Sequence, residues 1–391
     1  MRTRNALNRK LPRPAAGARR HFLLGTATAA GAAIAGFPMT ATAQAPAVLR
    51  FQGAWSAKDI RHEYALDYAR KVNDMSGGRV RIEVLSAGAV VKPHDLLDAV
   101  EKGALDGCHA APSYWARKDT AFALFGAGPA FGMDANLLLS WMEYGGGKAL
   151  YEELYARVLH LNVTGFLCGP MPAQPLGWFK KPLASPAEIM GLRLRAAGLP
   201  GELFGEMGAA VQDLAYEEIM PAARAGRLDA AAFGNLTSDA QLGLPEAFPV
   251  CMLQSYHQPA QVFEVLFNKK RFEALPAEVR AIARYAAQAA SADAAWKAAD
   301  RDSANHERLR QRPGTRLLKT PPEVLRAQLK AWSSVAARRS RDNPAFEKIL
   351  KSQQAWARRV VAWSLDSAAD PRLAYDYWFA KPPAAGASGK R

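Results

Sequence analysis

The 391-residue sequence is poor in the residues that metal sites and many enzymes require. Its three cysteines, Cys108, Cys168 and Cys251, are far apart and lie in apolar stretches, which favours buried thiols over a disulfide framework or a CxxC metal site. Pairing of two of them in an exported protein stays open. The seven histidines show no metal-ligand spacing, and no Gly-x-Ser-x-Gly elbow or dinucleotide loop occurs.

Acidic residues are absent from residues 1–43, which carry seven basic ones. Arg19-Arg20 precedes an apolar stretch that is rich in alanine and glycine, an order typical of a secretory signal peptide, and the arginine pair is similar to the twin-arginine export motif. Gly36 and Pro38 interrupt this stretch, which is too weakly apolar for a membrane span. We predict a signal peptide over residues 1–43, or 1–45, and a soluble periplasmic protein.

The excess of positive charge is smaller in the mature chain. Removing the seven signal-peptide charges from the net charge of +15 leaves +8, and the remaining basic residues are mixed with acidic ones. Such a surface steers anions but does not indicate nucleic-acid binding. No nucleic-acid partner is expected.

One pattern occurs twice, at residues 95–106 and 218–229. The matched pairs are Ala99 with Ala222, Gly103 with Gly226, Leu105 with Leu228 and Asp106 with Asp229. Each copy predicts a short amphipathic helix, a glycine at positive φ and a buried strand. Two copies favour two α/β lobes of similar build with a ligand between them.

The remaining sequence patterns predict the strands and helices of the two lobes. Strands are predicted at 48–54, 79–85, 105–111, 162–169, 176–179, 209–214, 228–233 and 264–267, and helices at 94–103, 134–159, 201–208, 216–225 and 276–305. Ser56 is expected to cap the first helix, with Asp59 as its capping-box partner. Lobe I is predicted at 44–165 and 254–295, lobe II at 166–253 and 296–342, a C-terminal helix with an extension at 343–379, and a disordered tail at 380–391.

The order of these landmarks resembles the extracytoplasmic solute-binding proteins of TRAP transporters, the DctP family. The landmarks are Trp55, Gly77-Gly78-Arg79-Val80, Leu97 to Asp106, Pro129 to Gly132, Gly177-Trp178-Phe179, Gly191 to Arg195, Gly226 to Asp229 and Phe267-Asn268-Lys269. Trp141 to Gly147 and Gln174 to Phe179 are similar to the branch that binds α-keto acids. The resemblance implies an α/β two-lobe periplasmic-binding-protein clamp, with a mixed sheet in each lobe and several crossings, that delivers a small organic carboxylate to a membrane permease.

Arg195 matches the family's carboxylate-binding arginine. Its predicted place at a strand end suits this role, because a guanidinium fork meets a carboxylate in two parallel hydrogen bonds. The alternatives are that Asp213 or Asp239 neutralises Arg195, or that Arg193 is the ligand-binding arginine.

Other residues are expected near the ligand. Gln174 matches a polar ligand contact of the branch, although a surface-loop glutamine is equally consistent with its two flanking prolines. The predicted aromatic walls are Trp55, Tyr114, Trp115, Phe233 and Tyr256, each of which is a core residue on the alternative interpretation. Asn235, Thr237 and Ser238 are candidates for hydroxyl groups of the ligand.

Two carboxylates of the α-keto-acid branch are missing. The resemblance places a metal-binding Glu-Trp pair where this chain has Ala232-Phe233, and a second acidic position where it has Gln258. Gln174, Gln258 and backbone oxygens are a poor set for Ca²⁺ and a weak one for Na⁺. We expect no metal and no cofactor, and the α-keto-acid specificity is open.

Two other functions fit the sequence less well. One is a ligand-sensing module that docks on a membrane sensor kinase, and the other is a periplasmic enzyme with His109 or His257 as its base.

The C-terminal helix is expected to begin at Asn343 and Pro344. Its apolar seam, at steps of three and four, is Phe346, Ile349, Gln353, Trp356, Val360 and Trp363. The helix either braces both lobes of its own chain or, as the resemblance implies, is exchanged between two subunits of a homodimer.

Overall fold

The computed structural model describes residues 46–126 and 128–379. The predicted signal peptide at 1–43 and the predicted tail at 380–391 lie outside these residues.

Lobe I is built on a five-stranded mixed sheet in the order β2-β1-β3-β10-β4. Its strands are β1 (Ala47–Gly53), β2 (Val80–Leu85), β3 (Gly107–Ala110), β4 (Val163–Met171) and β10 (Gln261–Asn268). The first three are parallel, and β10 is antiparallel to β3 and β4. The helices of this lobe are α1 (Ile60–Met75), α2 (Leu96–Glu101), α3 (Ala135–Tyr144), α4 (Gly147–Glu153) and α9 (Lys269–Glu273), with 3-10 turns η1 (Pro93–Asp95), η2 (Pro112–Arg117), η3 (Thr120–Phe125) and η4 (Ala130–Gly132) and a π-helical turn at Leu154–Val158.

Lobe II is built on a six-stranded mixed sheet in the order β11-β9-β5-β8-β6-β7. Its strands are β5 (Gly177–Phe179), β6 (Arg193–Arg195), β7 (Ala210–Gln212), β8 (Ala230–Ala231), β9 (Val250–Met252) and β11 (Arg316–Leu318). Strand β5 is antiparallel to β8 and β9. The helices are α5 (Gly198–Glu206), α6 (Tyr216–Arg224), α7 (Leu236–Leu242) and α8 (Leu244–Ala247), with a 3-10 turn η6 (Pro186–Ile189). The fold is thus the expected α/β one, with a mixed sheet in each lobe.

The repeated pattern has the predicted conformation in both copies. Gly103 follows α2 with φ of 77° and Gly226 follows α6 with φ of 68°, values that glycine adopts without strain. After α6 the amide of Arg227 donates to the carbonyl of Ala222 and that of Gly226 to Ala223, each at 3.0 Å, which is a Schellman ending. The chain then enters β3 in lobe I and β8 in lobe II, both inside their sheets.

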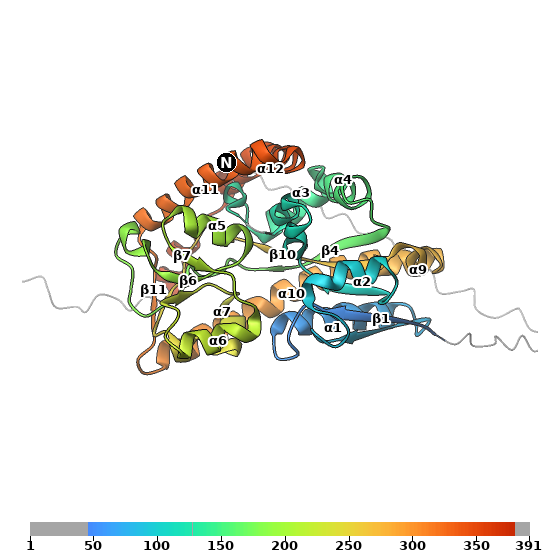
Figure 1. Ribbon diagram of the computed structural model, residues 1–391, viewed down its shortest axis with the longest axis horizontal. Helices are drawn as coiled ribbons and strands as arrows, with labels where there is room; N and C mark the ends of the chain where they lie inside the picture. Colours follow the sequence, from blue (N-terminus) through green and yellow to red (C-terminus); the bar gives the residue numbers. More distant parts are fainter. Residues whose placement is uncertain (1–45, 127, 380–391) are drawn as a thin grey trace, which may run out of the picture. The chain divides into compact units, whose positions relative to one another are not determined.

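Several crossings join the lobes, and the longest is the 35-residue helix α10 (Ala277–Gln311). Lys71 Nζ on α1 lies 2.5 Å from Asp293 Oδ2 near the middle of α10. Further along, Asp302 accepts a hydrogen bond from the Thr237 hydroxyl of α7 at 2.6 Å. Figure 1 shows α10 running from beside α9 towards α7. The expected lobe boundary at residue 165 falls inside β4, which continues to Met171.

The start of α1 differs from the prediction. Asp59, not Ser56, is the N-cap: its backbone is extended, with φ of −90° and ψ of 139°, and its side chain accepts a hydrogen bond from the amide of Arg61. Ser56 instead belongs to a turn, in which its carbonyl accepts from the Asp59 amide at 2.9 Å. A carboxylate at the cap also suits the positive end of the helix dipole.

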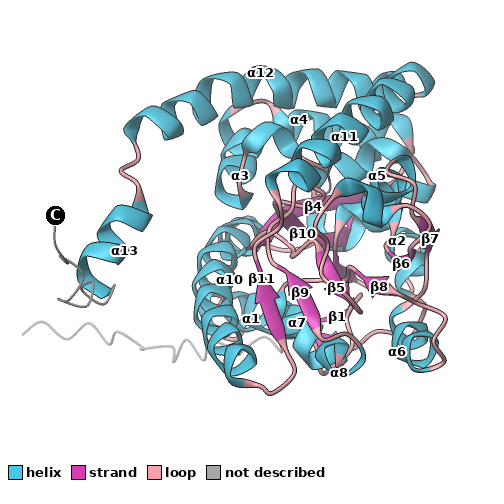
Figure 2. Cartoon of the chain, turned by 90° about the vertical axis from the view of Figure 1, so that its left-hand side faces the viewer, coloured by secondary structure: helices cyan, strands magenta, loops and turns pink. Residues whose placement is uncertain are grey.

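Three helices form the C-terminal region, of which the first two, α11 and α12, run along one side of the two lobes (Figures 1 and 2). They are α11 (Pro322–Asp342), α12 (Pro344–Ser367) and α13 (Pro371–Phe379). Asn343 caps α12 as predicted. The seam is buried only in its first half, at Phe346, Ile349 and Gln353, whereas Trp363 is 71% exposed.

Among the described residues, no single helix is long and apolar enough to cross a membrane. A bent pair of segments at 120–132 and 135–144 meets the length and composition requirements only.

Candidate functional site

Arg195 is the last residue of β6, and its guanidinium is held by backbone carbonyls. Nε and Nη2 donate to the Leu214 carbonyl at 3.2 and 3.0 Å, and Nη1 donates to the Ala232 carbonyl at 2.9 Å. These bonds use three of the five N–H groups of an arginine, so one N–H remains on each Nη. The group is therefore fixed in place, with two N–H groups that form no hydrogen bond to the described residues.

No carboxylate forms an ion pair with Arg195 among the residues that the structure describes. The two sequence alternatives are engaged elsewhere: Asp213 lies 3.7 Å from Arg117, and Asp239 accepts from Trp178 Nε1 at 3.0 Å. Burial lowers the pKa of Arg195, because a desolvated cation is costly without a counter-ion. A buried cation of this kind favours an anionic partner.

Arg193, the rival on the same strand, is neutralised. Its Nε and Nη2 donate to the two carboxylate oxygens of Asp229 at 2.8 and 2.6 Å. Asp229 also lies 3.0 Å from Lys180 Nζ. Asp229 belongs to the repeated sequence pattern, but that pattern did not indicate that Asp229 would pair with Arg193 and Lys180.

Phe233 and Trp55 meet across the two lobes around a second arginine that the sequence analysis missed. The Cζ atom of Arg61 lies 4.6 Å from the ring centre of Phe233 and 4.8 Å from that of Trp55, within cation–π range. Arg195 Cζ lies 5.4 Å from the same Phe233 ring. The only signal for Arg61 was its position two residues after Asp59, which is weak on its own.

Tyr114 completes this cluster from lobe I. Its ring packs edge-on against Trp55, with centroids 5.6 Å apart. Burial raises the pKa of Tyr114, while the nearby cations Arg61 and Arg195 act in the opposite direction. Trp55, Tyr114 and Phe233, three of the aromatic residues expected near the ligand, thus lie close together.

Trp115 was wrongly placed in that wall. Its side chain is 1% exposed and donates to the buried carboxyl of Glu264, which also accepts from Tyr151 and Tyr155. Tyr114 and Trp115 lie in the 3-10 turn η2, in which neighbouring side chains point in different directions. Burial raises the pKa of Glu264 to about 7.

Gln174 lies beside the cluster rather than on the surface. Its Nε2 donates to the Phe233 carbonyl at 3.4 Å, and its Oε1 lies 3.3 Å from His257 Nε2. The backbone N–H of Gln174 donates to the backbone carbonyl of Gln258 at 3.0 Å. The Gln258 side chain donates to the Gly126 carbonyl at 2.9 Å.

Asn235 and Tyr256, which were also expected near the ligand, form hydrogen bonds with other residues of the fold. Asn235 is fully buried; its Oδ1 caps α7 by accepting from the Ser238 amide at 2.9 Å, and its Nδ2 donates to Asp302 at 3.2 Å. Both ends of this side chain are therefore used by the fold. Tyr256 is half-buried, and its backbone amide donates to Gln328 at 2.9 Å.

The two histidines considered as enzymatic bases are buried. His109 Nδ1 accepts from Trp55 Nε1 at 2.8 Å, and burial lowers the pKa of His109 to about 3. Burial has the same effect on the pKa of His257, also to about 3. A base of such low pKa accepts a proton poorly near neutral pH.

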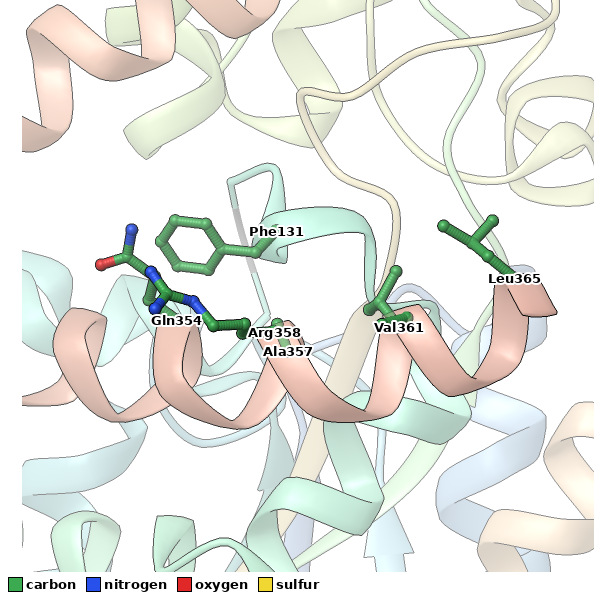
Figure 3. A pocket seen from close by; sticks show the side chains of 7 residues that line it. Phe131, Gln354, Ala357, Arg358, Val361 and Leu365 are labelled. Atoms are coloured by element: carbon green, nitrogen blue, oxygen red, sulfur yellow. The ribbon is translucent and has the colours of Figure 1, made fainter. Parts of the chain in front are cut away.

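Two surface hollows lie away from the Arg195 cluster. One, of about 340 Å³, lies between η4 and α12 and is lined by Phe131, Gln354, Ala357, Arg358, Val361, Ala362 and Leu365 (Figure 3). The other, of about 310 Å³, is lined by residues of η6, α5 and α11.

Two lobes, each with a mixed sheet, are the architecture of two-lobe solute-binding proteins. The family model of the bacterial extracellular solute-binding proteins, family 7 (DctP), matches residues 51–341. The chain belongs to this family.

Known relatives bind small carboxylates. A periplasmic protein of Nostoc sp., described as binding monocarboxylate 2-oxoacids, is 30% identical over 298 residues, which are 76% of this chain and 80% of that protein. A TRAP solute-binding protein from Pseudoalteromonas atlantica, solved with sodium and pyruvate, is 26% identical with a TM-score of 0.77 and covers 85% of this chain and 99% of its own. One from Colwellia psychrerythraea, solved with calcium and pyruvate, is 25% identical with a TM-score of 0.78 and covers 85% and 100%.

The donors near Arg195 do not fit a calcium or sodium ion of the kind bound by those relatives. Ala232 offers only a backbone carbonyl, which already accepts from Arg195, and Gln174 Oε1 lies against His257. Over the described ranges no group of three His, Cys, Asp or Glu residues is placed to hold a metal ion. Hard cations require several oxygen ligands, of which carboxylates bind best.

Proposed function

We propose that this chain is a periplasmic receptor that captures a small keto- or hydroxy-acid between its lobes and delivers it to a TRAP-type membrane permease. The observation that carries the proposal is Arg195, a buried cation with no carboxylate partner among the described residues and with two N–H groups left for a ligand. The binding partners of the relatives from Nostoc and Pseudoalteromonas support the same ligand class.

The physics of this site favours a small anion. Each charge-assisted hydrogen bond contributes about 1.5–3 kcal/mol, and aromatic walls lower the local dielectric and strengthen the contact. Trp55 and Tyr114 come from lobe I and Phe233 from lobe II. A ligand that touches both lobes stabilises their contact.

Direct hydrogen bonds between the lobes support this closure. Ser238 Oγ donates to Asp59 Oδ1 at 3.1 Å, and the amide of Ile60 donates to Gln241 Oε1 at 3.0 Å. Both join the start of α1 to α7. The ligand is released unchanged when these contacts open, so the protein has no enzymatic step in this proposal.

The C-terminal region supports a homodimer as part of the same proposal. The second half of α12 and all of α13 expose large apolar side chains, namely Trp363, Leu365, Leu373, Tyr375, Tyr377, Trp378 and Phe379. Figure 2 shows α13 extending away from the lobes. Many large exposed apolar side chains on one short segment favour a protein partner, and a second copy offers the same segment in return.

The proposal is tested by identifying the small molecule that remains with the purified protein. Mass spectrometry after denaturation is expected to find a keto- or hydroxy-acid with one carboxylate, and calorimetry with pyruvate and lactate is expected to show binding. A retained ligand without a carboxylate, or no binding of any carboxylate to ligand-free protein, would contradict the proposal. Recovery of a chemically altered molecule after incubation would instead favour an enzyme.

A further inference from the structure

Two guanidinium groups, one from each lobe, lie against the Phe233 ring. Arg61 comes from α1 of lobe I and Arg195 from β6 of lobe II. Arg61 is only 5% exposed and also lies over Trp55. The pair therefore marks the point where the lobes meet around the candidate ligand.

The two cations differ in their charge balance. Asp59 Oδ1 accepts from Arg61 Nε at 2.9 Å and Asp59 Oδ2 from Nη2 at 2.5 Å. Arg61 is therefore part of a neutral pair, although three of its five N–H groups have no hydrogen bond to the described residues. Arg195 forms no ion pair with a carboxylate among the residues that the structure describes. Asp59, Arg61 and Arg195 together therefore carry one net positive charge.

We propose that Arg61 is a second ligand-binding group, which donates to the oxygen on the carbon next to the ligand carboxylate. This inference rests on the proposed function. Arg61 would then supply hydrogen-bond donors from the chain itself, whereas the two relatives solved with pyruvate also hold a sodium or a calcium ion. Asp59 leaves Arg61 able to donate hydrogen bonds but cancels its charge.

The balance set by Asp59 selects for ligands with one negative charge. A monocarboxylate matches the single uncompensated cation, Arg195. The second carboxylate of a dicarboxylic acid would be buried without a free positive partner, and the desolvation of an unpaired charge is costly. The receptor should therefore discriminate between acids that differ only in a second carboxylate.

Lobe II holds this pair in position. Ser238 Oγ on α7 donates to Asp59 Oδ1 at 3.1 Å, and Asp59 is 2% exposed. Although burial opposes ionisation of both groups, the pairing raises the pKa of Arg61 and lowers that of Asp59. Both groups therefore stay charged near neutral pH.

The test uses calorimetry with pyruvate, lactate and malate, because malate is lactate with one additional carboxylate. The wild-type protein is expected to bind pyruvate or lactate and to bind malate at least about tenfold more weakly. Arg61→Gln should weaken binding of the monocarboxylate by about tenfold or more, whereas the control Arg70→Gln, on the exposed side of the same helix, should not. Asp59→Asn should shift the ratio of malate to lactate affinity towards malate by about tenfold.

Since Arg61→Gln leaves Asp59 buried without its partner, the double variant Asp59→Asn/Arg61→Gln is measured as well, with thermal melts of each. Loss of monocarboxylate affinity in a folded double variant supports the role of Arg61. Wild-type affinity in either folded variant overturns it, as does wild-type protein that binds malate as tightly as lactate; the receptor function stands in both cases. Failure of the wild-type protein to bind any of the three acids overturns the keto- and hydroxy-acid function itself.

Discussion

At the scale of single residues, the proposed carboxylate site depends on Arg195. Arg195→Ala removes both free N–H groups of the fork, so we expect affinity for pyruvate or lactate to fall about hundredfold or more, while circular dichroism still shows a folded protein. Arg193→Ala on the same strand is the matched control, because Arg193 is paired with Asp229 at the surface. Binding by Arg195→Ala at wild-type affinity would show that the ligand carboxylate is held elsewhere.

Ala232 and Gln258 lead to a second residue-scale prediction. Because neither supplies a carboxylate, ligand binding should not depend on a metal ion. Calorimetry after dialysis against EDTA, and separately in sodium-free buffer, should give affinities within about tenfold, or about 1.4 kcal/mol, of the untreated protein. A larger loss in either buffer would require cation ligands other than these two positions.

Glu264 should make stability depend on pH. Its pKa is about 7 in the folded protein, raised by burial from an ordinary 4.5, so between these values the folded chain holds a proton that the unfolded chain releases. Stability should therefore fall as pH rises from about 4.5 to about 7, by on the order of 3 kcal/mol. Thermal melts of wild type and Glu264→Gln at pH 5 and pH 7.5 check this, and parallel pH profiles would contradict it.

Most residues of the candidate site could be predicted from the sequence, but Arg61 could not. Arg195, Phe233 and Tyr114 follow strands or joints with recognisable patterns. Arg61 gains its place from the Asp59 cap and from Phe233, which is contributed by the other lobe. Trp115 was misplaced for a related reason, since an irregular turn such as η2 has no simple periodicity to show which side chain points inwards.

At the scale of elements, some helix ends could be predicted from the sequence and one could not. The glycine endings of α2 and α6 and the Asn343 start of α12 were predictable, because each depends on local backbone conformation. The start of α1 was not predictable, because Ser56 and Asp59 are both good capping residues. Only the turn between them determines which of the two caps the helix.

Asn343 offers an element-scale test. Its Oδ1 accepts from the amides of Ala345 and Phe346 at 2.9 and 3.1 Å, and its Nδ2 donates to Asp119 at 2.7 Å. Asn343→Ala removes both functions and should cost about 1–2 kcal/mol of stability. Asn343→Ser retains a capping oxygen and should cost less. Equal denaturant midpoints for the two variants would show that only the hydrogen bonds donated by Nδ2, to Asp119 and Thr120, matter.

At the scale of the whole molecule, the described chain leaves one large apolar surface uncovered. The first half of α12 packs on lobe I, where Phe346 and Ile349 are buried. Ala357 and Val361 still pack on this lobe, but Trp363 and Leu365 near the end of α12 are exposed, as are the large side chains of α13, among which Trp378 is 73% exposed. The sequence indicated a long seam but not where the chain's own lobes cease to cover it, because that depends on how far the lobes extend.

We therefore expect the exported protein to be a homodimer at micromolar concentration, joined through this surface, because burying its aromatic side chains in a second copy contributes about 25 cal/mol per Å² of apolar area removed from water. Light scattering coupled to size exclusion checks the mass. A chain ending at Ser367 keeps the part of α12 that packs on lobe I but lacks α13, and it should shift towards monomer while its melting temperature stays close to that of the full chain. A monomeric full-length protein would contradict the homodimer, and an unchanged dimer after truncation would place the contact away from α13. Retained carboxylate binding by the truncated monomer would show that each clamp works without its partner.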